Sequence, residues 1–236
     1  LVPPDRVVDI NRVDTFRGIV PAGGGVIVGA LTTLEEAAES PLLADYRSLI
    51  DIVDGVRSIQ IQSMGTIGGD LCHLPNCWYF RNGYGLLGIE NGESLPELGD
   101  NRYHAVLGNR GPAKFVSASR FAPPCIAWNA RVRVIGPEAG AEEWVPLEYF
   151  YVTPKMSNHG VTVLKPGQLV SHIWLPDTQG YRSGAYEVLE TTGLDWPLAA
   201  ASACISLQQG TVAEAQIVLG HVAPTPGVAH EAASAI

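Results

Sequence analysis

The sequence predicts an α+β fold arranged as two units. In the first third, apolar strand patterns alternate with helical spacing, whereas residues 168–219 carry strand patterns. Pro, Gly and Asn cluster between residues 151 and 166, which indicates a domain boundary. With 236 residues, 46% of them hydrophobic, the chain is long enough to bury a core.

The first unit begins with a short apolar stretch, Arg6–Ile10, which predicts a strand, and Gly25–Leu31 predicts a second strand. Thr33 precedes Glu36 by three residues, which is the spacing of a capping box at the start of a short helix. Leu43–Val56 has apolar residues at helical spacing and is expected to form the next helix.

The later elements follow from caps, alternation and turns. Ser119 stands before an early pair of prolines, and this order predicts a helix over Ala122–Asn129. Arg131–Ile135 alternates as a strand. Further strands are expected, the last two flanking Gln208–Gly210 as the arms of a hairpin: 168–175, 185–189, 199–207 and 213–219.

Composition excludes several classes of function. The net charge of −9 opposes nucleic-acid phosphates and anionic lipid, so we expect neither a nucleic-acid nor a membrane partner. No apolar run reaches the roughly 18 residues that a membrane span needs. Charged residues make up only 17% of the chain, beside 26 glycines and 17 prolines, which indicates tight turns and surface covered by partners.

The sharpest local motif is the glycine-rich segment Gly65–Asp70, which reads Gly-Thr-Ile-Gly-Gly-Asp. Paired glycines let backbone amides approach an anionic oxygen, and a pyrophosphate is a natural guest. The glycines alone are equally consistent with a tight turn, because neither a Rossmann nor a Walker pattern is complete.

Thr66–Asp70, preceded by Arg57–Gln62, resembles the second FAD-binding segment of the flavoprotein (medium) subunit in molybdenum hydroxylases. This group contains the xanthine dehydrogenases, carbon monoxide dehydrogenases and bacterial aldehyde oxidoreductases. Further segments that resemble the family are spread along nearly the whole chain: Val26–Leu34, Cys77–Gly83, Asn101–Val106, Asp195–Ala199 and Leu219–Pro224.

The resemblance implies a PCMH-type FAD-binding domain, incomplete at the N-terminus, over residues 1–155. Residues 1–20 would be the remnant of its first subdomain, and residues 21–155 the second subdomain with an insertion at 72–111. Residues 165–236 would form a small C-terminal domain with a three-stranded antiparallel sheet and helices.

The same resemblance implies where the cofactor lies. In relatives the glycine-rich segment wraps the FAD pyrophosphate through backbone amides. Val56 is implied to lie against the flavin ring, and Val170 to contact the ring or the adenosine side. The expected cofactor-binding residues are Val56, Gly65, Thr66, Ile67, Gly68, Gly69, Asp70 and Val170.

The sequence departs from the family pattern in three places. The first FAD segment, read as Ala-Gly-Gly-Thr-Asp, is expected upstream of Asp5 and is not in this sequence. Arg120 stands where the family has a carboxylate, and Glu187 where it often has a lysine. A carboxylate beside the flavin would disfavour the anionic reduced form. These departures support an alternative, a degenerate structural subunit with weak or no FAD binding.

Cysteines and histidines predict no metal site and no catalytic residue. Some relatives carry a [4Fe-4S] cluster in the insertion, but a cluster needs four thiolates, and only Cys72 and Cys77 lie there. Cys125 and Cys204 are expected to be buried free thiols. No histidine belongs to a nucleophile motif. The aromatic residues of Trp78–Tyr84 are expected in core or interface packing.

The resemblance therefore implies the FAD subunit of a multi-subunit molybdenum hydroxylase. Substrate would be oxidised at molybdopterin in a large subunit, and electrons would pass through [2Fe-2S] centres of a small subunit to the FAD of this chain and on to an acceptor. A self-contained oxidase is a further alternative. We expect a cytoplasmic location, with export alongside a partner left open.

Overall fold

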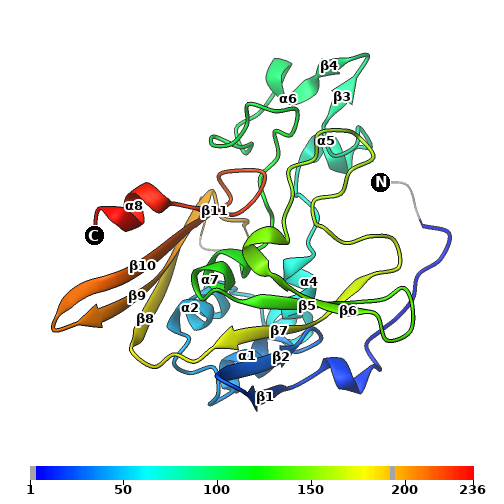
Figure 1. Cartoon of the computed structure of the whole chain (residues 1–236). Coiled ribbons are helices and arrows are strands. Elements are labelled where there is room, and N and C mark those ends of the chain that lie inside the picture. The colour runs from blue at the N-terminus through cyan, green and yellow to red at the C-terminus, as the bar shows by residue number, and fades with distance from the viewer. Residues whose placement is uncertain (1–3, 192–194) are drawn as a thin grey trace.

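The computed structural model describes residues 4–191 and 195–236, and its strands form two large antiparallel sheets and a small ribbon (Figure 1). The first sheet has the order β1-β2-β7-β5-β6, and every neighbouring pair is antiparallel. Its strands are β1 (Ile19–Ala22), β2 (Gly25–Gly29), β5 (Arg131–Ile135), β6 (Glu142–Pro146) and β7 (Leu169–Pro176).

The second sheet has the order β11-β10-β9-β8. The predicted hairpin is confirmed, because Gln208 pairs with Thr211 across a two-residue turn. Gln209 and Gly210 both have positive φ, 52° and 83°, as a primed hairpin turn requires. The family resemblance led us to expect three strands, and a short fourth strand is added at one edge. The strands are β8 (Tyr181–Val188), β9 (Ala199–Gln208), β10 (Thr211–Gly220) and β11 (Gly227–Val228).

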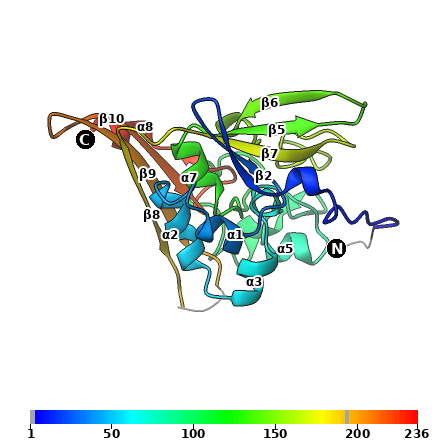
Figure 2. The ribbon, with the colours of Figure 1, turned by 90° about the horizontal axis from the view of Figure 1, so that it is seen from below.

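Helices fill the space between the two sheets. Figure 2 shows α2 and α7 between β8–β10 on one side and the first sheet on the other, and both helices contact the second sheet. One hydrophobic core joins Val28 and Ile173 of the first sheet to Val218 of the second. The two units therefore share a core. The helices near this core are α1 (Leu34–Glu39), α2 (Arg47–Gly55), α3 (Ile59–Met64), α4 (Ile67–Leu71) and α7 (Ala122–Ala127).

Strand β7 belongs to the first sheet. It pairs with β2 along one edge and with β5 along the other. The strand lies inside residues 165–236, which were expected to form the C-terminal domain. Its hydrogen bonds place it with the first unit instead, so the crossing between the sheets falls between Pro176 and Tyr181.

The expected strand at Arg6–Ile10 is wrong. This stretch pairs with no strand among the residues that the structure describes, and Val7 and Val8 are 81% and 72% exposed, so its apolar centre faces no core. The helix expected over Leu43–Val56 begins only at Arg47, because residues 41–45 form turns. The Tyr46 hydroxyl then donates to the Pro176 carbonyl over 2.7 Å and ties the start of α2 to the end of β7.

The insertion at 72–111 projects from the sheets as a separate lobe (Figure 1). Cys77 and Leu87 of the insertion share a small second core with Phe115 and Val161, which lie outside it, and Tyr79 and Phe80 pack against this core. Packing of the aromatic cluster is thus confirmed for these two residues. The regular elements of the insertion are α5 (Trp78–Arg81), β3 (Ile89–Glu90), β4 (Glu93–Ser94) and α6 (Leu95–Leu98); elsewhere lie α8 (His230–Ser234) and the 3₁₀ turns η1 (Asp14–Phe16) and η2 (Leu147–Tyr149).

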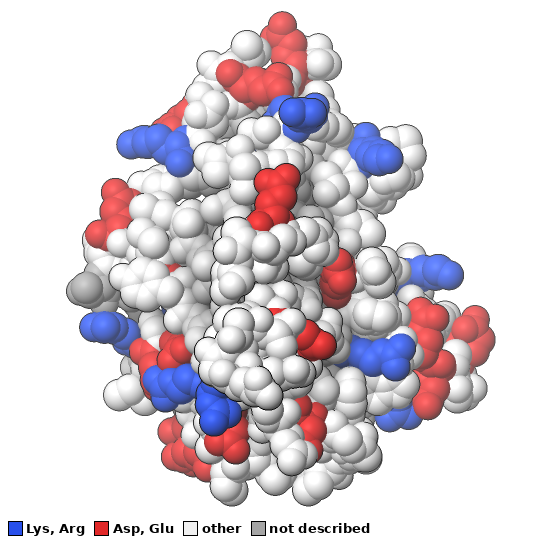
Figure 3. All heavy atoms as spheres, turned by 60° about the vertical axis from the view of Figure 1, so that its left-hand side comes forward, with Lys and Arg blue, Asp and Glu red and all other residues white. Residues whose placement is uncertain are grey.

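The distribution of charged side chains on the surface agrees with the low content of charged residues in the sequence. On the face drawn in Figure 3, basic and acidic side chains are interspersed among large uncharged areas, without a basic patch. Within residues 4–191 and 195–236, no helix has the length and apolar character needed to cross a membrane.

The capping box that starts α1 supplies the first prediction. The Thr33 hydroxyl accepts from the Glu36 amide over 3.2 Å, and the Glu36 carboxylate accepts from the Thr33 amide over 2.8 Å. We expect Thr33→Ala to lower the free energy of unfolding by about 1 kcal/mol, because an amide at the helix start loses its partner. Urea denaturation measures the change. Thr33→Ser keeps the hydroxyl, and an equal loss in that variant would contradict the explanation.

Candidate cofactor-binding site

The glycine-rich segment forms the junction between two short capped helices. The Ser58 hydroxyl caps α3 by accepting from the Ile61 amide, and the Thr66 hydroxyl caps α4 by accepting from the Gly69 amide over 3.1 Å. The Gln62 side chain donates to the Val56 carbonyl over 2.8 Å, which ties α3 to the end of α2. The sequence thus fixes a turn here through local caps.

Most backbone amides of the turn bind within the chain. The Ile67 amide donates to the Thr32 carbonyl over 3.1 Å, and the Gly68 amide to the Ala30 carbonyl over 2.9 Å. A side chain at Gly68 would collide with this neighbour, since an added Cβ would lie 2.5 Å from the Ala30 Cβ. The Asp70 amide donates to the Thr66 carbonyl. Gly68 is therefore needed for the close approach of two chain segments, and these amides are not free to hold a pyrophosphate.

Thr66 and Gly69 remain as the part of the turn that fits an anionic oxygen. The Thr66 hydroxyl accepts from the Gly69 amide, and within residues 4–191 and 195–236 it donates to no acceptor, so its proton is available. Gly69 is exposed and has no side chain to block a ligand. The donor chemistry fits one phosphate oxygen at this point, held by a hydroxyl rather than by a ring of amides.

The carboxylate of Asp70 points to a different part of the chain. It accepts from the Ser119 hydroxyl over 2.6 Å, from the Phe121 amide over 3.0 Å and from the Arg120 amide over 3.3 Å. Ser119 in turn accepts from the Ala122 amide at the start of α7, as the sequence predicted. Burial raises the pKa of Asp70, and these hydrogen bonds oppose the rise. Asp70 therefore fastens the turn to the loop before α7.

The two internal departures from the family pattern meet in space. The guanidinium of Arg120 and the carboxylate of Glu187 form a two-pronged ion pair, with Nε and Oε1 2.8 Å apart. Both side chains are buried, with exposed fractions of 12% and 5%. The pair lies against the end of α2, because a Cβ on Gly55 would be 3.0 Å from Glu187 and 3.1 Å from Arg120. The penalty expected from a lone carboxylate at Glu187 is offset by its partner.

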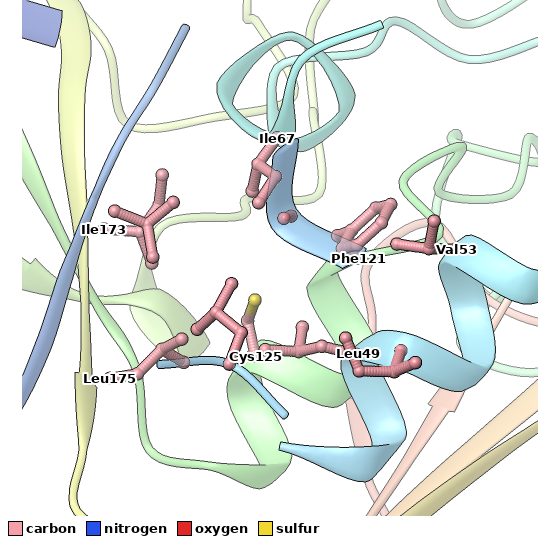
Figure 4. A pocket seen from close by; sticks show the side chains of 11 residues that line it. Leu49, Val53, Ile67, Phe121, Cys125, Ile173 and Leu175 are labelled. Carbon is pink, nitrogen blue, oxygen red and sulfur yellow. The ribbon is translucent and has the colours of Figure 1, made fainter. Parts of the chain in front are cut away.

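The expected apolar contacts lie in the protein core. Val56 ends α2 and Val170 lies on β7 opposite Val134, and all three side chains are buried. Ile67 points with Phe121 into an apolar cavity between the helices and the first sheet (Figure 4). That cavity has a volume of about 10 Å³, room for at most about one water molecule, so it holds no ligand.

A cleft that the sequence did not reveal lies between the insertion and the second sheet. Its volume is about 470 Å³, within the range of small-molecule sites. Trp78 and Tyr103 line it from the insertion, and Trp196 and His221 from the second unit. The Trp196 ring also contacts the His73 ring just after α4, with centroids 4.9 Å apart. None of the eight expected residues lines this cleft.

The pKa values of the two histidines that line the cleft are lowered, which favours the neutral imidazole. Burial lowers the pKa of His104, whose Nε2 lies 3.2 Å from the Cys77 sulfur. Burial and the nearby charge of Arg120 lower the pKa of His221 to about 4. Aromatic segments of the insertion and the second unit were visible in the sequence, but their meeting depends on the path of the chain.

The cysteines are free thiols, and Cys125 and Cys204 are buried as expected. Burial raises the pKa of the Cys72 thiol to about 11 and that of Cys204 to about 12, so both stay protonated. In the part of the chain that the structure describes, no group of His, Cys, Asp and Glu side chains could hold a metal ion.

Comparison with known proteins decides the family. Residues 1–178 match the family described as the FAD binding domain in molybdopterin dehydrogenase. The chain belongs to this family. The carbon monoxide dehydrogenase medium chain of Hydrogenophaga pseudoflava is 26% identical over 223 residues, which cover 94% of this chain and 61% of that protein. The aldehyde oxidoreductase FAD-binding subunit PaoB of Escherichia coli is 26% identical over 234 residues, which cover 94% of this chain and 70% of that protein.

Solved structures have the same fold. A carbon monoxide dehydrogenase of H. pseudoflava that lacks the Mo-pyranopterin moiety matches with a TM-score of 0.69 and 25% identity, over 97% of this chain and 63% of that one. Quinoline 2-oxidoreductase of Pseudomonas putida 86 matches in fold, with a TM-score of 0.69 and 20% identity, over 99% of this chain and 65% of that one. The family resemblance is confirmed, and this FAD-domain chain spans 61% of the length of the H. pseudoflava medium chain.

The contact between the FAD-domain turn and Ala30 can be tested by adding one methyl group. We expect Gly68→Ala to lower the free energy of unfolding by about 1–3 kcal/mol, because the new Cβ overlaps backbone and Cβ atoms of Ala30. Gly111→Ala is the matched control, since a Cβ there would meet nothing within 4 Å. Chemical denaturation of both variants gives the comparison, and equal stability would refute the role of Gly68.

His221 predicts a dependence of stability on pH. Its folded pKa of about 4 lies below the ordinary 6.5, so the unfolded chain binds more protons between these values. The stabilisation is fully present above pH 6.5 and is lost as the pH falls toward 4, by at most about 3 kcal/mol. We expect His221→Gln to flatten the unfolding free energy across this window, measured by denaturation at each pH. An equally steep loss of stability between pH 6.5 and 4 in His221→Gln would contradict this assignment.

Proposed function

We propose that this chain is the FAD-binding part of an electron-transfer subunit in a multi-subunit molybdenum hydroxylase. The observation that carries the proposal is the family match over residues 1–178, which includes the glycine-rich turn. The named relatives are medium or FAD-binding subunits of carbon monoxide dehydrogenase and aldehyde oxidoreductase. The chain would receive electrons from [2Fe-2S] centres of a small subunit and pass them to an acceptor, while a molybdopterin-binding large subunit oxidises the substrate.

Two residues of the chain would make the direct contact with the cofactor pyrophosphate. The Thr66 hydroxyl would donate to a phosphate oxygen, and the bare backbone of Gly69 would let that oxygen approach. Ile67, Gly68 and Asp70 would build the turn rather than touch the ligand, because their amides bind within the chain. When bound, FAD supplies the electron-carrying chemistry, and the protein supplies binding and orientation.

The aromatic cleft is the second part of the proposed site. Trp78, Tyr103 and Trp196 give it flat apolar surfaces, and the lowered pKa values of its histidines favour the neutral imidazole. This lining suits the planar ring chemistry that flavin and its electron acceptors share. The chain's residues would then act by holding ring systems and excluding water.

One observation favours a second candidate function, a structural subunit with weak or no FAD binding. The amides of Ile67, Gly68 and Asp70 are already satisfied within the chain. A pyrophosphate would then have few donors in this chain, and FAD affinity would be low. The fold would still offer surfaces to partner subunits.

Titration of the purified chain with FAD separates these functions. We expect a yellow complex with quenched tryptophan fluorescence, and we expect Thr66→Ala to raise the dissociation constant by about tenfold, because a hydrogen bond to a charged oxygen is lost. Thr66→Ser retains the hydroxyl and should bind as the parent chain does. A folded chain whose tryptophan fluorescence FAD does not quench, and that is colourless once free FAD is removed by gel filtration, would favour the structural subunit.

A further inference from the structure

A buried ion pair is the place where the loop before α7 meets the second sheet. Arg120 lies in that loop, and Glu187 lies on the inner face of β8, near its end. Within the described residues, the hydrogen bonds that join loop 119–121 to β8 are those from Arg120 to Glu187. The contact has a fixed geometry, because a guanidinium and a carboxylate that meet in two prongs hold both distance and plane.

The same loop is fastened to the glycine-rich turn from its other side. The Asp70 carboxylate accepts from the amides of Arg120 and Phe121 and from the Ser119 hydroxyl. Asp70 follows Gly69 directly and closes the first turn of α4, since its amide donates to the Thr66 carbonyl. An unbroken series of hydrogen bonds therefore runs from Thr66 through Asp70 and Arg120 to Glu187.

Other contacts hold β8 in place independently of this series. The Ala185 amide donates to the Asp51 carboxylate over 3.0 Å, and the Ser183 hydroxyl accepts from the Ser48 amide over 3.0 Å. Both contacts join β8 to α2 and bypass the loop. Loss of the Arg120–Glu187 pair would therefore remove the hydrogen bonds from the loop to β8 while β8 stays attached to α2.

We propose that Arg120 and Glu187 are positioning residues that hold the glycine-rich turn in its ligand-binding shape, acting through loop 119–121 and Asp70. The expected effect of the ion pair on FAD affinity rests on the proposed function. The expected effect of the ion pair on the shape of the turn does not. Neither residue is itself a ligand contact in this proposal. The opposite charges explain why both positions depart from the family pattern together: each change alone would leave a buried charge without a partner.

The test uses charge reversal in the full chain: Arg120→Glu, Glu187→Arg, and the two combined. Hydrogen-deuterium exchange of the 67–71 amides, measured without FAD, reports how well the turn is held in place. Titration with FAD reports the affinity of the turn for its proposed ligand. We expect each single variant to speed exchange and raise the FAD dissociation constant by about tenfold, equal to 1.4 kcal/mol. The double variant should recover both quantities. Arg133→Glu, which breaks the more exposed Arg133–Glu142 pair, is the matched control and should change neither.

The outcomes are distinct. Unchanged exchange in both single variants, or a double variant that regains its melting temperature but not its slow exchange, would overturn the proposal. If the parent chain binds no FAD, the proposed function fails, and the exchange measurement still decides the role of the pair. If a single reversal prevents folding, Arg120→Lys keeps the charge but loses the two-pronged geometry. It should speed exchange of the 67–71 amides relative to the parent chain, and no change would again overturn the proposal.

Discussion

The arrangement of this protein depends on the carboxylate of Asp70. It accepts hydrogen bonds from the Ser119 hydroxyl and from the amides of Arg120 and Phe121, and so it joins α4 to the start of α7. Since α7 lies between the two sheets, this group sets the glycine-rich turn relative to both of them. The carboxylate is tolerated there because a hydroxyl and two backbone amides satisfy its oxygens.

Two opposite charges, those of Arg120 and Glu187, compensate each other near the glycine-rich turn. Arg120 and Glu187 would each be a largely buried charge without a partner if considered alone, and they neutralise each other where their side chains meet. Removing both charges from water has a cost, and the two-pronged pair offsets part of this cost while fixing the orientation of the partners. Burial, together with the nearby charge of Arg120, also lowers the pKa of His221, which lines the cleft. A charge pattern that suggests degeneration in the sequence is thus consistent with an intact, differently built site.

The shared core explains why the two units do not correspond to separate segments of sequence. Strand β7 completes the first sheet, and the chain crosses to the second sheet directly after Pro176. Val218 and Cys204 of the second sheet then pack in the same core as Ile126 of α7. The aromatic cleft arises from this arrangement, because the insertion and the second unit approach each other beside α4.

Local rules of sequence determined a large part of this protein. The Thr33 capping box, the Ser119 cap, the Gln209–Gly210 hairpin and the turn at Gly65–Asp70 depend on neighbouring residues, and each was predictable for that reason. The strand at Arg6–Ile10 failed because an apolar alternation forms a strand only beside a partner. The destinations of the Gly68 amide and the Asp70 carboxylate, the pairing of Arg120 with Glu187, and the aromatic cleft were decided by tertiary structure alone. Each joins residues far apart in the chain, and only the packing of helices between two sheets brings them within contact distance.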